Sequence, residues 1–268
     1  MRDVKPLSSP VDAQWKYGSE PPITDPVMIT LYRSRVGSIS YYAQCTRPDV
    51  AYAVNCLCRH LSNPNPVCFR ALNHLIHYLA GTPHYGIKYH MENSQTLRLE
   101  ELISLQNKTT TPTLSAYSDA SFGGEDCDSA RSQTGYIVYF GGGPIDWKSH
   151  VQPIIAQSSA ESEQVAAFNT ARTVFYFRQL LEEFGHAQTG STVIWEDNQA
   201  CIAQSKNPVN HSRSKHILLK YHYLRDLTES GIVRLEYIPT ADQIADIFTK
   251  PLPPKQFINL SRFLVQPV

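Results

Sequence analysis

The sequence predicts an α/β fold in which a mixed five-stranded sheet is flanked by helices and preceded by a mainly helical region. Two observations support this prediction. Stretches with the two-residue alternation of β-strands are bounded by glycine-rich breaks or by stretches with helical spacing of apolar residues. Their order is three strands, a helix, a strand, helices, a strand and a helix. This order indicates an antiparallel meander followed by crossover connections.

The chain of 268 residues opens with a polar segment rich in Pro and Ser, residues 1–26, which is typical of a linker or a cut end. Apolar residues then recur at helical spacing in three segments: 28–44, 50–61 and 69–79. Short strands are expected at 86–90 and 97–100. Nothing in this half groups titratable side chains in a catalytic way, so we expect a helical packing or connection region.

A polar stretch at 106–112 marks the expected boundary before the sheet. The first strand alternates between two faces, with Leu114, Ala116 and Ser118 on one and Ser115, Tyr117 and Asp119 on the other. The remaining elements are expected in this order: strands 135–140 and 145–148, helix 160–184, strand 192–197, helices 199–204 and 214–229, strand 232–238, and helix 241–249.

Composition argues against several classes of protein. The formal net charge is zero, so no overall field favours a polyanion, although a local basic surface is compatible with this balance. No run of about 18 apolar residues predicts a membrane span, and the N-terminus lacks the apolar core of a signal peptide. The six cysteines show no zinc-site spacing, as expected for reduced thiols in an intracellular protein.

Asp119 is the first candidate for chemistry, because it lies on a mostly apolar strand just before Gly123-Gly124. Burying an unpaired carboxylate is costly, so a partner is expected, and a metal ion is one candidate. Capping of the following turn is the alternative. The choice depends on whether further carboxylates occur in similar settings.

Two glutamates open the long helix in the stretch Ser158-Ser159-Ala160-Glu161-Ser162-Glu163. Ser158 and Glu161 have the spacing of a capping box, in which the glutamate turns back to the cap amide. Glu163 has no such local role. At 100° per residue, it shares one stripe of the helix with Ala167, Thr170, Val174 and Leu181. We therefore expect Glu163 to face the sheet.

Asp197 ends the fourth strand directly before a helix. It is either a helix cap, a role that Asn198 can also fill, or part of a site at the carboxyl end of the sheet. Asp246 lies in the last predicted helix, where Thr240 and Gln243 match a second capping box. That box leaves Asp246 with little local explanation.

Four carboxylates on distinct elements are thus candidates for one site: Asp119, Glu163, Asp197 and Asp246. Hard oxygen ligands without His or Cys suit Mg²⁺ or Mn²⁺ rather than zinc. Two such ions about 4 Å apart can activate a water and stabilise the leaving oxygen of a phosphodiester. The residues therefore indicate a two-metal phosphoryl-transfer site.

Ordered motifs run through most of the chain. The sheet region contains Tyr117-Ser118-Asp119-Ala120, Ser132-Gln133-Thr134-Gly135-Tyr136, Gly141-Gly142-Gly143-Pro144-Ile145-Asp146-Trp147, Ser158-Ser159-Ala160-Glu161-Ser162-Glu163, Asp197-Asn198-Gln199 and Ala245-Asp246-Ile247-Phe248-Thr249-Lys250. The helical region contains Tyr32-Arg33-Ser34-Arg35-Val36-Gly37, Thr46-Arg47-Pro48-Asp49-Val50-Ala51-Tyr52-Ala53-Val54 and Tyr78-Leu79-Ala80-Gly81-Thr82. Over roughly residues 28–252, this set resembles the C-terminal part of copia-type LTR retrotransposon Pol polyproteins.

The resemblance implies a reverse transcriptase C-terminal or connection region at 27–110, a ribonuclease H-like domain at 111–252 and a helical tail at 253–268. It implies hydrolysis of the RNA strand of RNA–DNA hybrids with two Mg²⁺ ions, or Mn²⁺. Motif by motif, it places the catalytic and metal-binding roles on Asp119, Glu163, Asp197 and Asp246. No Tyr-x-Asp-Asp polymerase signature occurs, so this chain is not expected to polymerise by itself.

The resemblance also implies partners and a compartment. The partners are an RNA–DNA hybrid and the polymerase part of a Pol polyprotein, with no membrane. The compartment is intracellular: the cytoplasm, with a virus-like particle or the nucleus as further locations. Basic and aromatic residues alternate over 211–225, and we expect His211, Arg213 and Lys215 to contact substrate phosphates. A solvated helix face is the alternative.

Three functional hypotheses follow. The first is a metal-dependent ribonuclease H, which the presence of all four carboxylates favours. The second is a catalytically silent transposon remnant that binds nucleic acid or a protein partner without turnover. An integrase-type nuclease of the same broad fold is disfavoured, because such a protein would lack the ordered motifs.

Overall fold

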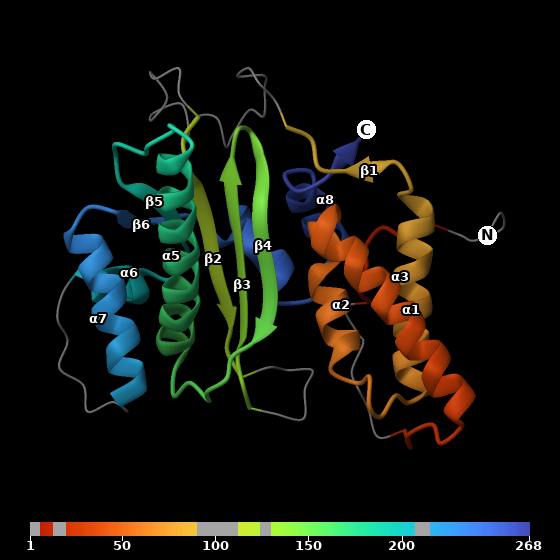
Figure 1. Cartoon of the computed structure of the whole chain (residues 1–268). Coiled ribbons are helices and arrows are strands. Elements are labelled where there is room, and N and C mark those ends of the chain that lie inside the picture. The colour runs from red at the N-terminus through yellow and green to blue at the C-terminus, as the bar shows by residue number, and fades with distance from the viewer. Residues whose placement is uncertain (1–5, 13–19, 90–111, 124–129, 207–214) are drawn as a thin grey trace.

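Strand β2 (Ser115–Ser121) occupies the centre of a five-stranded sheet with the order β4-β3-β2-β5-β6 (Figure 1). The computed structural model describes residues 6–12, 20–89, 112–123, 130–206 and 215–268. The other strands of this sheet are β3 (Gln133–Phe140), β4 (Gly143–Val151), β5 (Thr192–Glu196) and β6 (Val233–Tyr237). Strands β2, β3 and β4 pair antiparallel, whereas β5 is parallel to both β2 and β6. The predicted mixed five-stranded sheet is confirmed.

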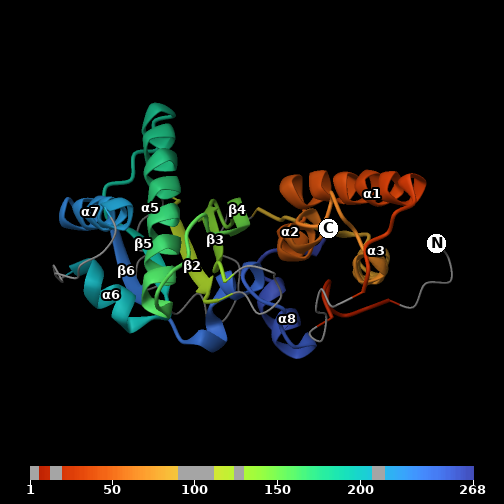
Figure 2. The same ribbon diagram turned by 90° about the horizontal axis from the view of Figure 1, so that it is seen from below.

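Three helices cover one face of this sheet: α5 (Ser159–Glu183), α6 (Gln199–Lys206) and α7 (Lys215–Glu229), as Figure 2 shows. The Ser158 hydroxyl caps α5 by accepting from the Glu161 amide at 3.2 Å, as predicted. The Glu161 carboxylate, in contrast, accepts from the Gln157 amide at 2.7 Å, one residue before the amide that a capping box uses. The predicted stripe of α5, including Glu163, is buried in the structure.

A second core lies on the opposite face. It combines residues of that face, among them Tyr117, Ile137 and Trp195, with helices from both ends of the chain. These helices are α1 (Pro26–Cys45), α2 (Ala51–Cys58), α3 (Pro66–Gly81) and α8 (Pro254–Ser261). The indole N–H of Trp147 on β4 donates to the Ala43 carbonyl at 2.9 Å and so ties the sheet to α1. The three predicted N-terminal helices are confirmed, although α2 ends at Cys58 rather than at Leu61.

The C-terminal residues pair with the segment that follows α3 in a small second sheet. Strand β1 (Tyr85–Gly86) pairs antiparallel with β7 (Gln266–Pro267), and the Val268 amide donates to the His84 carbonyl at 2.9 Å. The strand predicted at 86–90 is therefore shorter and starts one residue earlier than expected. The strand predicted at 97–100 lies outside the described residues. The predicted helical tail contains α8 but ends in β7.

The helix predicted at 241–249 is wrong. Two short 3₁₀ helices replace it, η2 (Thr240–Asp242) and η3 (Ile244–Phe248). The break is Gln243, whose extended backbone (ψ 102°) interrupts helical geometry. Its side chain accepts from the Ala245 amide at 3.2 Å and donates to the Ser118 carbonyl at 2.9 Å. Gln243 thus bonds to the middle of β2, so the predicted Thr240–Gln243 capping box does not form.

A buried ion-pair network connects the N-terminal helices. The Arg47 guanidinium donates to both carboxylate oxygens of Asp49, at 2.9 and 2.8 Å. It also donates to the carbonyl and hydroxyl oxygens of Thr82 at the end of α3, at 2.9 and 2.8 Å. The Tyr78 hydroxyl donates to Asp49 Oδ2 at 2.6 Å. Because each buried charge has several partners, the network links the end of α1 to the end of α3.

We expect Arg47→Leu to lower the free energy of unfolding by about 3–5 kcal/mol, because it leaves Asp49 as an uncompensated buried charge. Urea denaturation measures this loss. Arg70→Leu is the matched control, since Arg70 pairs with Glu20 in an exposed ion pair and should matter little. Equal losses in the two variants would contradict the argument from burial.

Candidate metal centre

Asp119 and Asp197 meet where two parallel strands end. Tyr117 of β2 lies opposite Trp195 of β5, so the residues two places further on, Asp119 and Asp197, come level with each other. Asp119 is only 2% exposed. Asn198 accepts from the Cys201 amide at 3.0 Å and so caps α6. Asp197 is thereby free of the capping role that the sequence left open.

Glu163 completes a group of three. It lies near the start of α5 on the side that faces the sheet, and it is 6% exposed. Asp119, Glu163 and Asp197 each offer a carboxylate oxygen, and these oxygens all lie within 4.8 Å of one another. Three of the four predicted carboxylates therefore converge, from β2, from α5 and from the end of β5.

Asp246 reaches the same region from η3, but it is paired differently. Its Oδ1 lies 2.7 Å from Nζ of Lys250, and the same ammonium lies 4.0 Å from Oδ2 of Asp119. The Thr249 hydroxyl also donates to Asp119 Oδ2. Asp246 is not in the group of three. Lys250 thus places one positive charge beside both Asp246 and Asp119.

Gly135 allows η3 to approach the sheet closely enough to place Asp246. It lies on β3 directly opposite Asp119. A Cβ atom at Gly135 would come within 2.6 Å of Cβ of Phe248 and within 2.9 Å of the Ala245 carbonyl oxygen. Any side chain at Gly135 would thus push η3 away from the strand.

Sequence reasoning missed Glu196. This last residue of β5 is fully buried, and its Oε1 accepts from the Asn198 amide at 3.2 Å. Burial and then the charge of Asp119 raise the pKa of Glu196 well above its usual range. Glu196 sits one residue before the candidate Asp197 on an apolar strand, the same local signal that singled out Asp119.

The ionised forms of these acidic groups are disfavoured where they lie. Burial and then the charge of Glu196 raise the pKa of Glu163 well above its usual range. Burial raises the pKa of Asp119 despite the opposing effects of Lys250 and Thr249. Burial and then the charge of Asp119 raise the pKa of Asp246 to about 8. A further cation would lower these pKa values, because an opposite charge favours the ionised form.

The residues present fit a divalent metal ion. Oε2 of Glu163 is buried and has no hydrogen-bond partner among the described residues. Three carboxylates with no His or Cys in the group form a hard oxygen donor set, which Mg²⁺ and Mn²⁺ prefer.

The side chains of the predicted substrate contacts lie outside the described part of the protein. His211 and Arg213 lie outside the described residues. Lys215 is the first residue of α7, but its side chain is not among those described.

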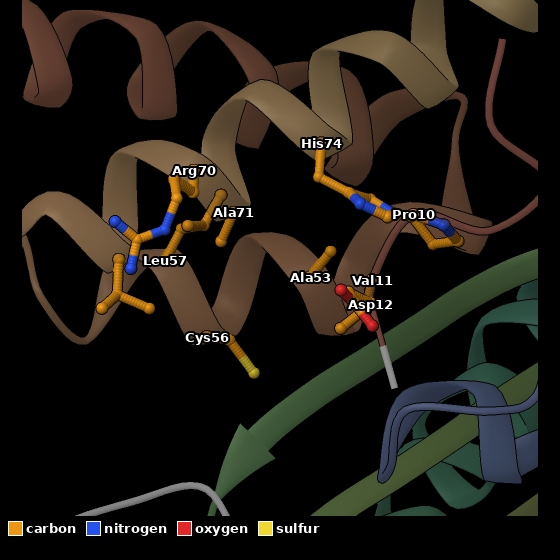
Figure 3. A pocket seen from close by; sticks show the side chains of 10 residues that line it. Pro10, Val11, Asp12, Ala53, Cys56, Leu57, Arg70, Ala71 and His74 are labelled. Atoms are coloured by element: carbon orange, nitrogen blue, oxygen red, sulfur yellow. The ribbon is translucent and has the colours of Figure 1, made fainter. Parts of the chain in front are cut away.

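A cavity of about 370 Å³ lies elsewhere, between α2, α3 and residues 10–12 (Figure 3). Its lining is mixed and includes Asp12, Cys56, Arg70 and His74. It contains no residue of the acidic group, so the candidate chemistry lies at the strand ends rather than in this cavity.

The chain is similar to two Pol polyproteins of Arabidopsis thaliana. It is 38% identical over 263 residues to the "Retrovirus-related Pol polyprotein from transposon RE1", covering 97% of this chain and 16% of that protein. It is 39% identical over 264 residues to the corresponding protein from transposon RE2, covering 98% and 17%. The chain belongs to this family of copia-type Pol polyproteins. The family resemblance inferred from the motifs is confirmed, and the chain spans about one sixth of these relatives.

The chain was also compared with solved structures and with protein-family models. The crystal structure of RNase H1 from Halobacterium salinarum NRC-1 aligns with 51% of this chain and 94% of its own, at 16% identity and a TM-score of 0.36. No family model matches the chain. Among the described residues, no helix combines the length and the apolar character needed to cross a bilayer.

We expect the metal-free protein to lose stability as pH rises from about 4 to about 8. In that window the unfolded chain has released the Asp246 proton, whereas the folded protein still holds it, so each rise in pH favours unfolding. Thermal melting in a chelator measures the slope. Saturating Mg²⁺ and, separately, Asp246→Asn should both flatten it. A slope that neither change alters would contradict the assignment.

We also expect Lys250→Met to tighten Mn²⁺ binding by roughly tenfold, because it removes a positive charge from beside two of the carboxylates. Titration calorimetry of the full chain measures the affinity. In chelator, the same variant should melt at a lower temperature than the parent protein. Lys255→Met, at an exposed position of α8, is the control. Unchanged or weaker Mn²⁺ binding in Lys250→Met would show that the Lys250 ammonium does not compete with the metal ion for these carboxylates.

Proposed function

We propose that this Pol segment is a metal-dependent ribonuclease H that hydrolyses the RNA strand of RNA–DNA hybrids during retrotransposon reverse transcription. The observation that carries the proposal is the convergence of Asp119, Glu163 and Asp197 within 4.8 Å at the ends of β2 and β5. Membership in the Pol family supports the choice of nucleic acid over other phosphodiesters.

The roles follow from position. We assign metal binding and catalysis to Asp119, Glu163, Asp197 and Asp246, with two Mg²⁺ ions, or Mn²⁺, as the cofactors. When bound, such ions activate a water and stabilise the leaving oxygen of the scissile phosphodiester. The carboxylates hold and orient the ions. The Lys250 ammonium lies 2.7 Å from Asp246 Oδ1 and 4.0 Å from Asp119 Oδ2, so it would compete with an ion for these two carboxylates.

The proposed partners are the RNA–DNA hybrid and the polymerase part of the same polyprotein. We propose that His211, Arg213 and Lys215 contact phosphates of the hybrid, and that discrimination of RNA from DNA depends on the 2′-hydroxyl. The proposed location is the cytoplasm, within a virus-like particle or free of one, or the nucleus.

Two glutamates two residues apart provide a sharp test. Glu163→Gln should abolish cleavage of a labelled RNA–DNA hybrid in Mg²⁺ or Mn²⁺, because it removes a ligand charge from the metal centre. Glu161→Gln should retain cleavage, because Glu161 only bonds to the Gln157 amide at the start of α5. Gel analysis of both variants and of Asp197→Asn, with melting temperatures to verify folding, measures the outcome.

The outcomes separate the two functional hypotheses. Cleavage that survives in Glu163→Gln or Asp197→Asn would refute the proposed site. Absence of cleavage by the folded parent chain, alone and with its polymerase part supplied, would favour the alternative: a silent remnant that binds without turnover.

A further inference from the structure

Two cations from different helices approach one aromatic ring of α5, on the side that faces α7. Cζ of Arg172 on α5 lies 5.9 Å from the centre of the Phe168 ring, and Nζ of Lys220 on α7 lies 5.7 Å from the same centre. Tyr223 of α7 packs edge-on against Phe168, with ring centres 5.4 Å apart. Both cations thus contact the same aromatic ring.

This arrangement works against Coulomb repulsion without a compensating acid. Among the described residues, no carboxylate lies within ion-pair distance of Arg172, Lys220 or Lys148. Burial and then the charge of Arg172 lower the pKa of Lys220, so the ammonium is disfavoured where it lies. Charges that repel each other and lack acids gain most from an external anion.

His150 on β4 extends the same surface. Its Nδ1 is buried and has no hydrogen-bond partner among the described residues. Burial, followed by the charges of Lys148, Arg172 and Lys220, lowers the pKa of His150 to about 4. Lys148 and His150 are two residues apart on β4 and share one face of the strand. Strand β4, helix α5 and helix α7 therefore direct basic groups toward one region.

The nearest acid described on β4 already has a partner. Asp146 accepts from the Tyr136 hydroxyl at 3.1 Å, and its charge interacts with Lys148. Asp146 is thus held by a hydrogen bond between β3 and β4, and it forms no ion pair with Arg172 or Lys220.

We propose that Lys148, Arg172 and Lys220 form a phosphate-binding surface for a nucleic-acid backbone, separate from the metal centre. Arg172 follows Glu163 by nine residues on α5, which is about 13 Å along the helix axis and about half a turn around it. A backbone that contacts Arg172 therefore lies about 13 Å along α5 from the carboxylates and on the side of the helix opposite to Glu163. The proposal rests on the proposed function only in taking that nucleic acid to be the flank of the cleaved hybrid.

The phosphate backbone is the occupant that this chemistry favours. Guanidinium and ammonium groups neutralise phosphates and release their counterions, and spaced cations suit a polymer with regularly spaced charges. Such contacts carry no base specificity, so the surface should bind hybrid and other duplexes alike. The surface therefore raises the affinity for nucleic acid and does not discriminate between sequences or duplex types.

The test measures binding without cleavage. In the Asp197→Asn background, fluorescence anisotropy gives the affinity for a labelled hybrid over a range of salt concentrations. We expect Arg172→Gln combined with Lys220→Gln to reduce the slope of log affinity against log salt by about 2, since each lost phosphate contact lowers it by about 0.9. Arg172→Lys combined with Lys220→Arg should keep the slope, because it keeps both charges.

The matched control removes the same charges elsewhere. Lys255→Gln combined with Arg262→Gln affects two exposed residues in and just after α8 and should leave the slope unchanged. Equal slopes for the two glutamine pairs would overturn the proposal. So would a loss confined to binding of anionic lipid vesicles, tested in parallel.

Failure of the proposed function gives a different result. If the parent chain cleaves no hybrid but the α5–α7 glutamine pair still lowers the slope, the surface stands and the ribonuclease assignment falls. If the parent chain cleaves hybrid but the α5–α7 glutamine pair leaves the slope unchanged, the ribonuclease assignment stands and the proposed surface falls.

Discussion

Negative charge gathered at the ends of β2 and β5 is the constraint on which the surrounding structure depends. Five acidic residues meet there, Asp119, Glu163, Glu196, Asp197 and Asp246, and most of them are buried. Hydroxyl groups and one ammonium group around these acidic residues donate hydrogen bonds or form ion pairs with them. The Thr249 hydroxyl donates to Asp119, the Thr240 hydroxyl donates to Asp197 at 2.7 Å, and Lys250 pairs with Asp246.

Much of this arrangement could be predicted from local patterns. The alternation along β2 correctly separated Tyr117 from Ala116, and these two residues lie in different cores. The stripe argument for α5 correctly turned Glu163 inward, because a long helix on a sheet has one buried side whose period is known. The position of Asp197 at the end of a strand made it a candidate for the same site as Asp119, and the parallel pairing of β2 with β5 brings the two residues level.

The rest depends on contacts between distant residues. Thr240 and Gln243 have the spacing of a capping box, but Gln243 bonds to the carbonyl of Ser118, 125 residues away, and this contact replaces the expected helix. Asp246 and Lys250, which pair at 2.7 Å, lie on the segment whose path this contact changes. Local propensity contains no information about such partners. Gly135, in turn, is small because η3 packs against it, which no neighbouring residue reveals.

The second core makes the sheet and the N-terminal helices a single folding unit. Removing everything before β2 would uncover Tyr117, Ile137 and Trp195, strip the indole of Trp147 of its acceptor at Ala43, and leave β7 without its partner strand. A shortened protein that starts at the sheet would thus present a large apolar surface to water and would aggregate. Proteolytic processing that separated the two parts would have the same effect, so the five-stranded sheet is best maintained with its helical neighbour attached.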